Sequence, residues 1–148
     1  MKRKNLILLI LSVFILMQLV MGCRPIDEQA LTFTDQATEK YLAALNDQDY
    51  SGYKEDMDAG MLEAVTEEEF LKFSSYLKEN AGEYMPDSKK YSGYTTKNGN
   101  ILVVYRAGYT LEEAGVVVTT VISKSIEGTY KISGSWFDSP KLRETGYE

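Results

Sequence analysis

The spacing of apolar residues changes once along the chain, near Lys89. Before that point, apolar side chains recur every three or four residues, as they do on the buried face of a helix. After it, they alternate with polar side chains, as they do on the buried face of a strand. We therefore expect helices to come first and an antiparallel sheet to follow, which is the order of an α+β fold.

Two helices are expected before residue 60. The first begins with Thr34 as its N-cap and ends near Asn46, and the second begins with Asp49 and ends near Met57. Gly60 interrupts the pattern, and we expect an irregular apolar connection after it. The inward-facing residues of the two helices are expected to be Ala37, Tyr41, Ala44, Leu45, Tyr50, Tyr53 and Met57.

The third helix has the clearest start signal in the sequence. Thr66 and Glu69 form a capping box, in which each side chain bonds the backbone N–H of the other residue. The helix is expected to end near Asn80, just before Gly82, because glycine adopts the left-handed conformation that stops a helix. Its inward-facing residues are expected to be Phe70, Phe73, Leu77 and Ala81.

Four strands are expected in the second half, at residues 91–96, 101–110, 116–125 and 129–137. The first turn is Asn98-Gly99, the preferred pair for a tight hairpin, and residues 112–115 and 127–128 form the others. The third strand is apolar on both faces, which is typical of a strand inside a sheet. The sequence thus predicts three N-terminal helices packed on a curved, four-stranded antiparallel meander.

The first 22 residues have the three parts of a secretory signal peptide. Lys2-Arg3-Lys4 is basic, Leu6–Val20 is almost wholly apolar, and the small Gly22 comes just before a cysteine. Val20-Met21-Gly22-Cys23 resembles the lipobox of bacterial lipoproteins, in which the cysteine is acylated and becomes the new N-terminus. The resemblance implies lipid attachment at Cys23 and a place on the extracytoplasmic face of the cell membrane.

The alternative is an uncleaved signal anchor, although the apolar run is about fifteen residues and a spanning helix needs roughly twenty. Under the lipoprotein interpretation, residues 23–33 form a lipidated tether. Residues 34–138 form the domain, and residues 139–148 form a C-terminal tail.

Composition narrows the classes of function. Removing residues 1–22 takes away three of the 16 basic residues and none of the 22 acidic ones, which leaves a net charge of −9. A domain this acidic is a poor candidate for binding nucleic acid. The chain has no histidine and one cysteine, so Ser-His-Asp catalysis and the usual His/Cys zinc sites are excluded. The acids of 47–58 lack the spacing of a calcium loop, and no cofactor is expected.

The predicted order of elements resembles the DUF3887 family of the NTF2-like, or cystatin-like, superfamily. The resemblance spans residues 34–138. It is carried by Asp49-Tyr50 at the start of the second helix and by Lys131-Ile132-Ser133-Gly134-Ser135-Trp136-Phe137 at the close of the sheet. It implies the fold and no catalytic residues, since the family name records an unknown function.

The resemblance also implies a conical pocket, because NTF2-like sheets curl around one between the sheet and the helices. The strand residues expected to line it are Tyr91, Tyr105, Tyr109, Arg106, Tyr130 and Trp136. The alternative is ordinary packing, since tyrosine fits a half-buried strand surface whatever the function. Arg106 faces the same way as Leu102 and Val104, so its head is expected in water at the sheet edge.

These observations favour a non-catalytic module that binds a small apolar ligand or a protein, with a homodimer through the sheet face as one form of the latter. The alternative is an enzyme of the isomerase or dehydratase type that uses a pocket carboxylate and tyrosines. Such a base is expected inside an apolar strand, and Ile101–Thr110 and Val116–Ser123 contain no acid. Asp138, just beyond Trp136, is the acid placed best for that role.

Overall fold

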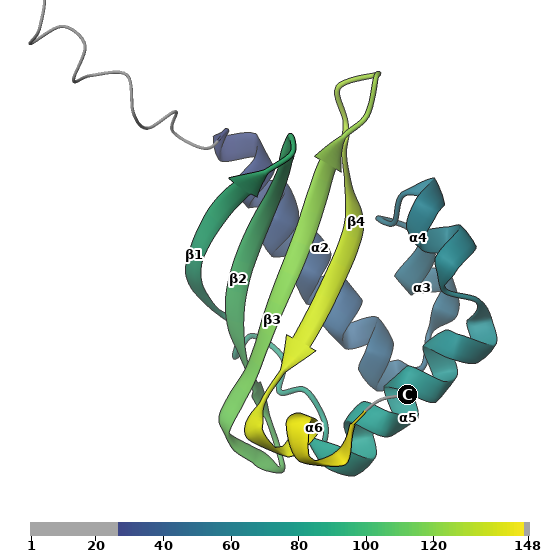
Figure 1. The fold of residues 1–148 in the computed structure, drawn as a ribbon. Helices are drawn as coiled ribbons and strands as arrows, with labels where there is room; N and C mark the ends of the chain where they lie inside the picture. The colour runs from purple at the N-terminus through teal and green to yellow at the C-terminus, as the bar shows by residue number, and fades with distance from the viewer. Residues whose placement is uncertain (1–26, 147–148) are drawn as a thin grey trace, which may run out of the picture.

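The computed structural model of the protein describes residues 27–146, and the predicted signal peptide and Cys23 lie outside them. The described chain is an α+β fold in which most of the helices precede a four-stranded sheet (Figure 1). The elements are α2 (Glu28–Asp47), α3 (Tyr50–Lys54), α4 (Ala59–Ala64), α5 (Glu67–Asn80), β1 (Lys90–Lys97), β2 (Asn100–Tyr109), β3 (Glu112–Lys124), β4 (Tyr130–Asp138) and α6 (Pro140–Thr145).

The sheet is an antiparallel meander with the strand order β1-β2-β3-β4, as predicted. Asn98 and Gly99 both have positive φ angles, of 53° and 81°, which confirms the tight hairpin between β1 and β2. β3 lies inside the sheet, as its two apolar faces indicated. β1 and β4 are the two edge strands.

The long helix α2 crosses one face of the sheet and forms the main layer of the core with it (Figure 1). Its predicted apolar face is confirmed, since Ala37, Tyr41, Ala44 and Leu45 are all buried. One buried polar contact ties the layers together, because the hydroxyls of Thr38 on α2 and Thr120 on β3 lie 2.9 Å apart. Both groups are thereby satisfied within an apolar layer.

The predicted start of the first helix at Thr34 is wrong. The helix begins at Glu28, and the side chain of Asp27 caps it by accepting the backbone N–H of Gln29. Residues 28–33, expected in the tether, form its first turns. Thr34 is fully buried and its hydroxyl donates to Ala30 O at 2.6 Å, so it lies inside the helix. Thr34 resembled a cap because threonine can either cap a helix or lie inside one with its hydroxyl bonded to the preceding turn. The burial of Thr34 shows that it takes the second role.

The capping box is confirmed: Thr66 N donates to Glu69 Oε2 at 2.8 Å, and Glu69 N donates to Thr66 Oγ1 at 3.3 Å. Two short helices were not predicted. Asp58 caps α4 where an irregular connection was expected, and Ser139 caps α6, which replaces the predicted C-terminal tail. Leu142 of α6 is buried, and this contact holds the six-residue helix in place.

The predicted turn at residues 112–115 is also wrong, since β3 begins at Glu112. Glu112 is only 6% exposed and accepts the backbone N–H of Lys141 at 3.2 Å, at the start of α6. A hydrogen bond from Ser139 is the main cause that holds the pKa of Glu112 below its ordinary value. The carboxylate of Glu112 therefore links β3 to α6. The sequence gives no local signal for this contact, because Glu112 and Lys141 lie 29 positions apart.

Candidate functional site

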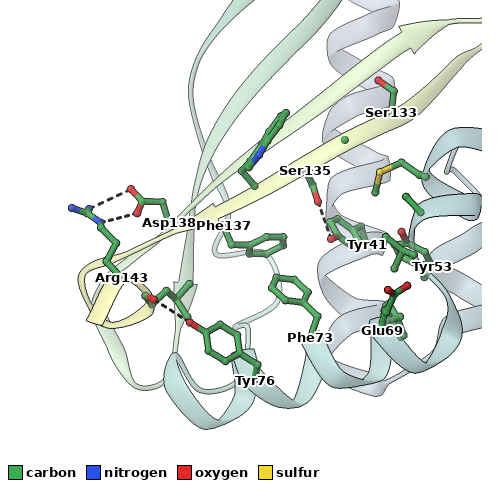
Figure 2. A pocket seen from close by; sticks show the side chains of 17 residues that line it. Tyr41, Tyr53, Glu69, Phe73, Tyr76, Ser133, Ser135, Phe137, Asp138 and Arg143 are labelled. Atoms are coloured by element: carbon green, nitrogen blue, oxygen red, sulfur yellow. Dashed lines mark hydrogen bonds and ion pairs between the residues drawn. The ribbon is translucent and has the colours of Figure 1, made fainter. Parts of the chain in front are cut away.

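A cavity of about 660 Å³ lies between the edge strand β4 and the helices α4 and α5, and α2 contributes to it (Figure 2). We call it the β4 groove. Its size falls in the range of ligand-binding pockets, about 300–1,000 Å³. The residues that line it are Tyr41, Tyr53, Met61, Ala64, Val65, Glu69, Phe70, Phe73, Tyr76, Ser133, Gly134, Ser135, Trp136, Phe137, Asp138, Leu142 and Arg143.

Packed aromatic rings form the helical side of the β4 groove. The ring centroids of Tyr53 and Phe70 lie 4.8 Å apart, and Phe73 meets Phe137 of β4 edge-on at 5.2 Å. Tyr41 also meets Phe137 edge-on, with the ring centroids 5.8 Å apart. Because each ring is held by another, the wall has a fixed shape and offers apolar surface with little conformational freedom to lose on binding.

Three phenol groups lie along this wall. Tyr41 and Ser135 share a hydrogen bond of 2.9 Å, and Tyr76 donates to Leu142 O at 3.0 Å. The hydroxyl of Tyr53 is buried and has no hydrogen-bond partner among the described residues. Burial raises the pKa of Tyr53 to about 12 and raises that of Tyr41 beyond the usual tyrosine range, so both phenols stay neutral into the alkaline range.

The carboxylates that line the β4 groove already have partners. Glu69 is occupied by the capping box, and its bond from the Thr66 backbone is the main cause that lowers its pKa. Asp138 accepts from Arg143 Nε at 2.7 Å and Nη2 at 3.3 Å (Figure 2). Both carboxylates are exposed, so neither has the buried setting that raises the pKa of a catalytic base.

The six predicted lining residues do not share one pocket. Trp136 lines the β4 groove and is 60% exposed. Tyr91 and Tyr105 lie 6.3 Å apart beside a shallower hollow against α2. Tyr109 is buried, and its hydroxyl lacks a partner among the described residues. Tyr105 and Tyr109 fill the layer between sheet and helix, as the packing alternative expected, whereas Tyr91 is 53% exposed.

The other two predicted residues lie elsewhere. Arg106 is exposed and donates to Ala114 O at 2.8 Å, so it closes the β2–β3 hairpin. Tyr130 donates to Asp27 Oδ2 at 2.8 Å and joins the first residue of β4 to the start of α2. The helical residues of the β4 groove were not predicted as site residues. Their helical spacing was visible in the sequence, but it indicated core positions equally well.

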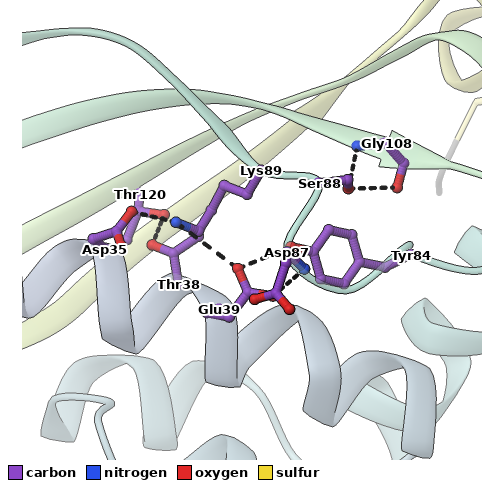
Figure 3. Close-up of polar contacts among 9 residues, drawn as sticks. All are labelled: Asp35, Thr38, Glu39, Tyr84, Asp87, Ser88, Lys89, Gly108 and Thr120. Atoms are coloured by element: carbon purple, nitrogen blue, oxygen red, sulfur yellow. Dashed lines mark hydrogen bonds and ion pairs between the residues drawn. The ribbon is translucent and has the colours of Figure 1, made fainter.

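A second polar cluster lies at the opposite edge of the sheet, between α2 and the start of β1 (Figure 3). The ammonium group of Lys89 pairs with Asp35, lies 3.9 Å from Glu39 and lies 4.5 Å above the Tyr105 ring. Tyr84 donates its hydroxyl to Glu39 at 2.8 Å. These groups satisfy one another, so the cluster fastens β1 to α2.

Within residues 27–146, no helix is both long enough and apolar enough to cross a membrane. In the same part of the chain, no group of three His, Cys, Asp or Glu side chains is arranged to hold a metal ion. No family model and no curated protein matches this chain.

Proposed function

We propose that the protein is an extracytoplasmic lipoprotein that binds a partner in the β4 groove without catalysing a reaction. The observation that carries the proposal is the groove itself. It is a cavity of about 660 Å³ with a packed aromatic wall and a mostly apolar surface. Cavities of this kind are the usual sites of ligand binding.

The state of its polar groups supports binding over catalysis. An isomerase-type site needs a carboxylate whose pKa is raised by burial, beside donors that stabilise the developing charge. In the β4 groove, Glu69 is engaged in a helix cap and Asp138 is paired with Arg143. Both lining carboxylates are therefore engaged, and neither is placed as an isomerase-type base.

The anchoring part of the proposal rests on the N-terminal sequence. The basic start, the apolar run and Val20-Met21-Gly22-Cys23 together resemble a lipobox. Lipoproteins of this type carry at least two acyl chains, and stable attachment needs more than one chain. The lipid would keep the binding domain at the membrane surface.

We also propose that the domain is NTF2-like and related to the DUF3887 family. The order of helices followed by an antiparallel meander supports this assignment. The position of the β4 groove, between sheet and helices, is compatible with the conical pocket of such folds. The quoted sequence Lys131–Phe137 supplies much of the strand side of the groove.

Native mass spectrometry of the protein purified from its source envelope tests the binding proposal. We expect added mass from a copurified molecule. Ala64→Phe should abolish it, because Ala64 is exposed on α4 and lines the groove. Ala59→Phe is the matched control, because Ala59 is exposed on the same helix and does not line the groove. The proposal would be overturned if no copurified or added molecule bound, or if both variants bound it equally.

Cys23→Ser tests the anchor separately. Serine cannot accept the thioether-linked lipid, so the protein should be misprocessed or released from the membrane. Membrane fractionation and the mass of the mature N-terminus are the measurements. Unchanged processing and retention would contradict the lipobox interpretation and leave the groove proposal standing.

A further inference from the structure

We infer that the occupant of the β4 groove is an extended peptide segment of a partner protein, which pairs with the free edge of β4 as an added strand. The inference deepens the proposed binding function and rests on it. Three observations carry it: the state of the strand edge, the direction of the cavity and the position of the helical wall.

The edge of β4 is paired only at its beginning. Ile132 N donates to Asp56 O and Ile132 O accepts from Asp58 N, both at 2.8 Å. This bridge ends at Ile132, and residues 133–138 have no strand on that side among the described residues. An unpaired edge presents backbone N–H and C=O groups that another strand can satisfy.

The cavity follows this edge. Ser135 and Phe137 point toward α2, since both contact Tyr41. Trp136 and Asp138 lie between and after them in the strand and therefore point to the opposite face. All six residues of 133–138 nevertheless line the groove (Figure 2). A cavity over one face would touch every second residue, so this cavity runs along the side of the strand.

The length of the free edge suits one strand. Six residues at about 3.3 Å each extend about 20 Å, which is the length of an ordinary strand. Peptides that add to a sheet edge gain affinity from backbone hydrogen bonds, and pockets for their side chains supply specificity. Met61 of α4 and the half-buried Phe73 and Tyr76 of α5 offer such an apolar surface beside the edge.

The helical wall favours a single segment over a second copy of this chain. Figure 1 shows α4 and α5 on the side of the molecule beside β4. Met61, Val65 and Phe73 line the groove on that side. If a second copy of the chain paired through its own β4, its α4 and α5 would come to the same edge and collide with those of the first copy. The net charge of −9 for residues 23–148 disfavours an acidic peptide.

The test uses the full-length protein in lipid nanodiscs and a displayed library of random heptapeptides. Trp136 is the only tryptophan and lines the groove, so its fluorescence reports occupancy directly. The best peptide is then synthesised in three forms: unmodified, N-methylated at its odd amides and N-methylated at its even amides. Because alternate amides of a strand point to opposite sides, only one set should bond to β4.

We expect the unmodified peptide to shift Trp136 emission to the blue and to slow amide hydrogen exchange within residues 133–138. One methylated form should bind at least tenfold more weakly, and the other should bind nearly as well as the parent. Ala64→Phe should weaken binding, and Ala59→Phe should not.

Equal effects of the two methylation patterns would overturn strand addition, and so would unchanged exchange in residues 133–138. A library that yields no groove-binding peptide would also overturn it. A copurified molecule in native mass spectra would then leave the broader binding function standing. Absence of both peptide and copurified molecule would remove both proposals.

Discussion

Tyr41 and Ser135 join the central helix to the edge strand, with their hydroxyl oxygens 2.9 Å apart at the β4 groove. The contact links residues 94 positions apart in sequence. It orients the part of β4 on which the proposed peptide pairs, because Ser135 is the middle of the free edge. The bond is therefore expected to matter for stability and for the geometry of the groove.

A double-mutant cycle measures this contact. Tyr41→Phe and Ser135→Ala should each lower the free energy of unfolding by about 1 kcal/mol, since each removes one partner of the same hydrogen bond. The double variant should lose little more than either single variant, because the bond can be lost only once. Urea unfolding supplies the four free energies, and strictly additive losses would show that the two hydroxyls are not coupled.

The buried tyrosines predict a loss of stability in alkali. Burial raises the pKa of Tyr53 to about 12 and raises those of Tyr41, Tyr84, Tyr105 and Tyr109 above the ordinary value of 10. Above pH 10 the unfolded chain releases protons that the folded chain keeps. The stability is therefore fully present below about pH 10 and falls as the pH rises through the folded-state pKa values.

Urea midpoints measured at several pH values above and below 10 check this prediction, with tyrosinate absorbance recorded in parallel. The absorbance of these five tyrosines should appear with unfolding. Tyr53→Phe should reduce the slope of stability against pH above 10, because it removes one of the shifted groups. Full ionisation of all eleven tyrosines near pH 10 in a folded protein would contradict the prediction.

Lys89 and Lys90 are adjacent in sequence, and comparing variants of the two distinguishes the effect of a buried contact from that of a surface charge. The side chain of Lys89 is 5% exposed and lies between Asp35, Glu39 and the Tyr105 ring. Lys89→Met should lower the free energy of unfolding by about 2 kcal/mol, because it removes the buried cation that pairs with Asp35 and with the partly buried Glu39. Lys90→Met is the control, and its effect should stay within about 0.5 kcal/mol because Lys90 is exposed. Equal thermal denaturation curves for the two variants would contradict this account of the cluster.

Gly82 and Gly99 have similar backbone angles, so comparing their alanine variants distinguishes the cost of backbone strain from the cost of crowding. Gly82 has a φ of +87° and Gly99 has a φ of +81°. A Cβ on Gly82 would collide with Thr110 Oγ1 and lie 2.7 Å from Leu111 N, whereas a Cβ on Gly99 would meet nothing within 4 Å. Gly99→Ala should therefore cost about 1 kcal/mol from strain alone. Gly82→Ala should cost about 3 kcal/mol, because overpacking adds to the strain.

Urea unfolding of the two alanine variants gives the comparison directly. The larger loss at Gly82 would mean that the end of α5 is fitted closely to the β2–β3 turn. Similar losses at both glycines would mean that this junction moves to accept a methyl group.

The parts of the fold that the sequence predicted are those with short-range signals. The capping box joins residues three apart, and the hairpin at Asn98-Gly99 depends on two adjacent residues. The meander and the interior place of β3 followed from alternation and from two apolar faces. The start of α2 could not be predicted in this way, because Asp27 and Thr34 are both suitable caps and only burial of Thr34 distinguishes them.

The candidate site was largely beyond prediction. Trp136 lies at the β4 groove on the sheet face opposite to α2, whereas Tyr105 and Tyr109 fill the core and Arg106 closes a hairpin. Strand alternation tells which residues share a face, and it does not tell which part of that face is covered by α2. We therefore expected the tyrosines to line one pocket, whereas the packing of α2 gives them different surroundings.

By itself, the sequence determined the order of helices and strands, the acidic character of the domain and the exclusion of histidine chemistry. These follow from composition and from contacts within a few residues, where local geometry is decisive. Only the tertiary structure decided where a partner could bind. Tyr41, Phe73 and Ser135 come from three elements, and they meet because α2 and α5 leave the edge of β4 uncovered beyond Ile132. That opening depends on how layers pack, and packing joins residues that no local pattern connects.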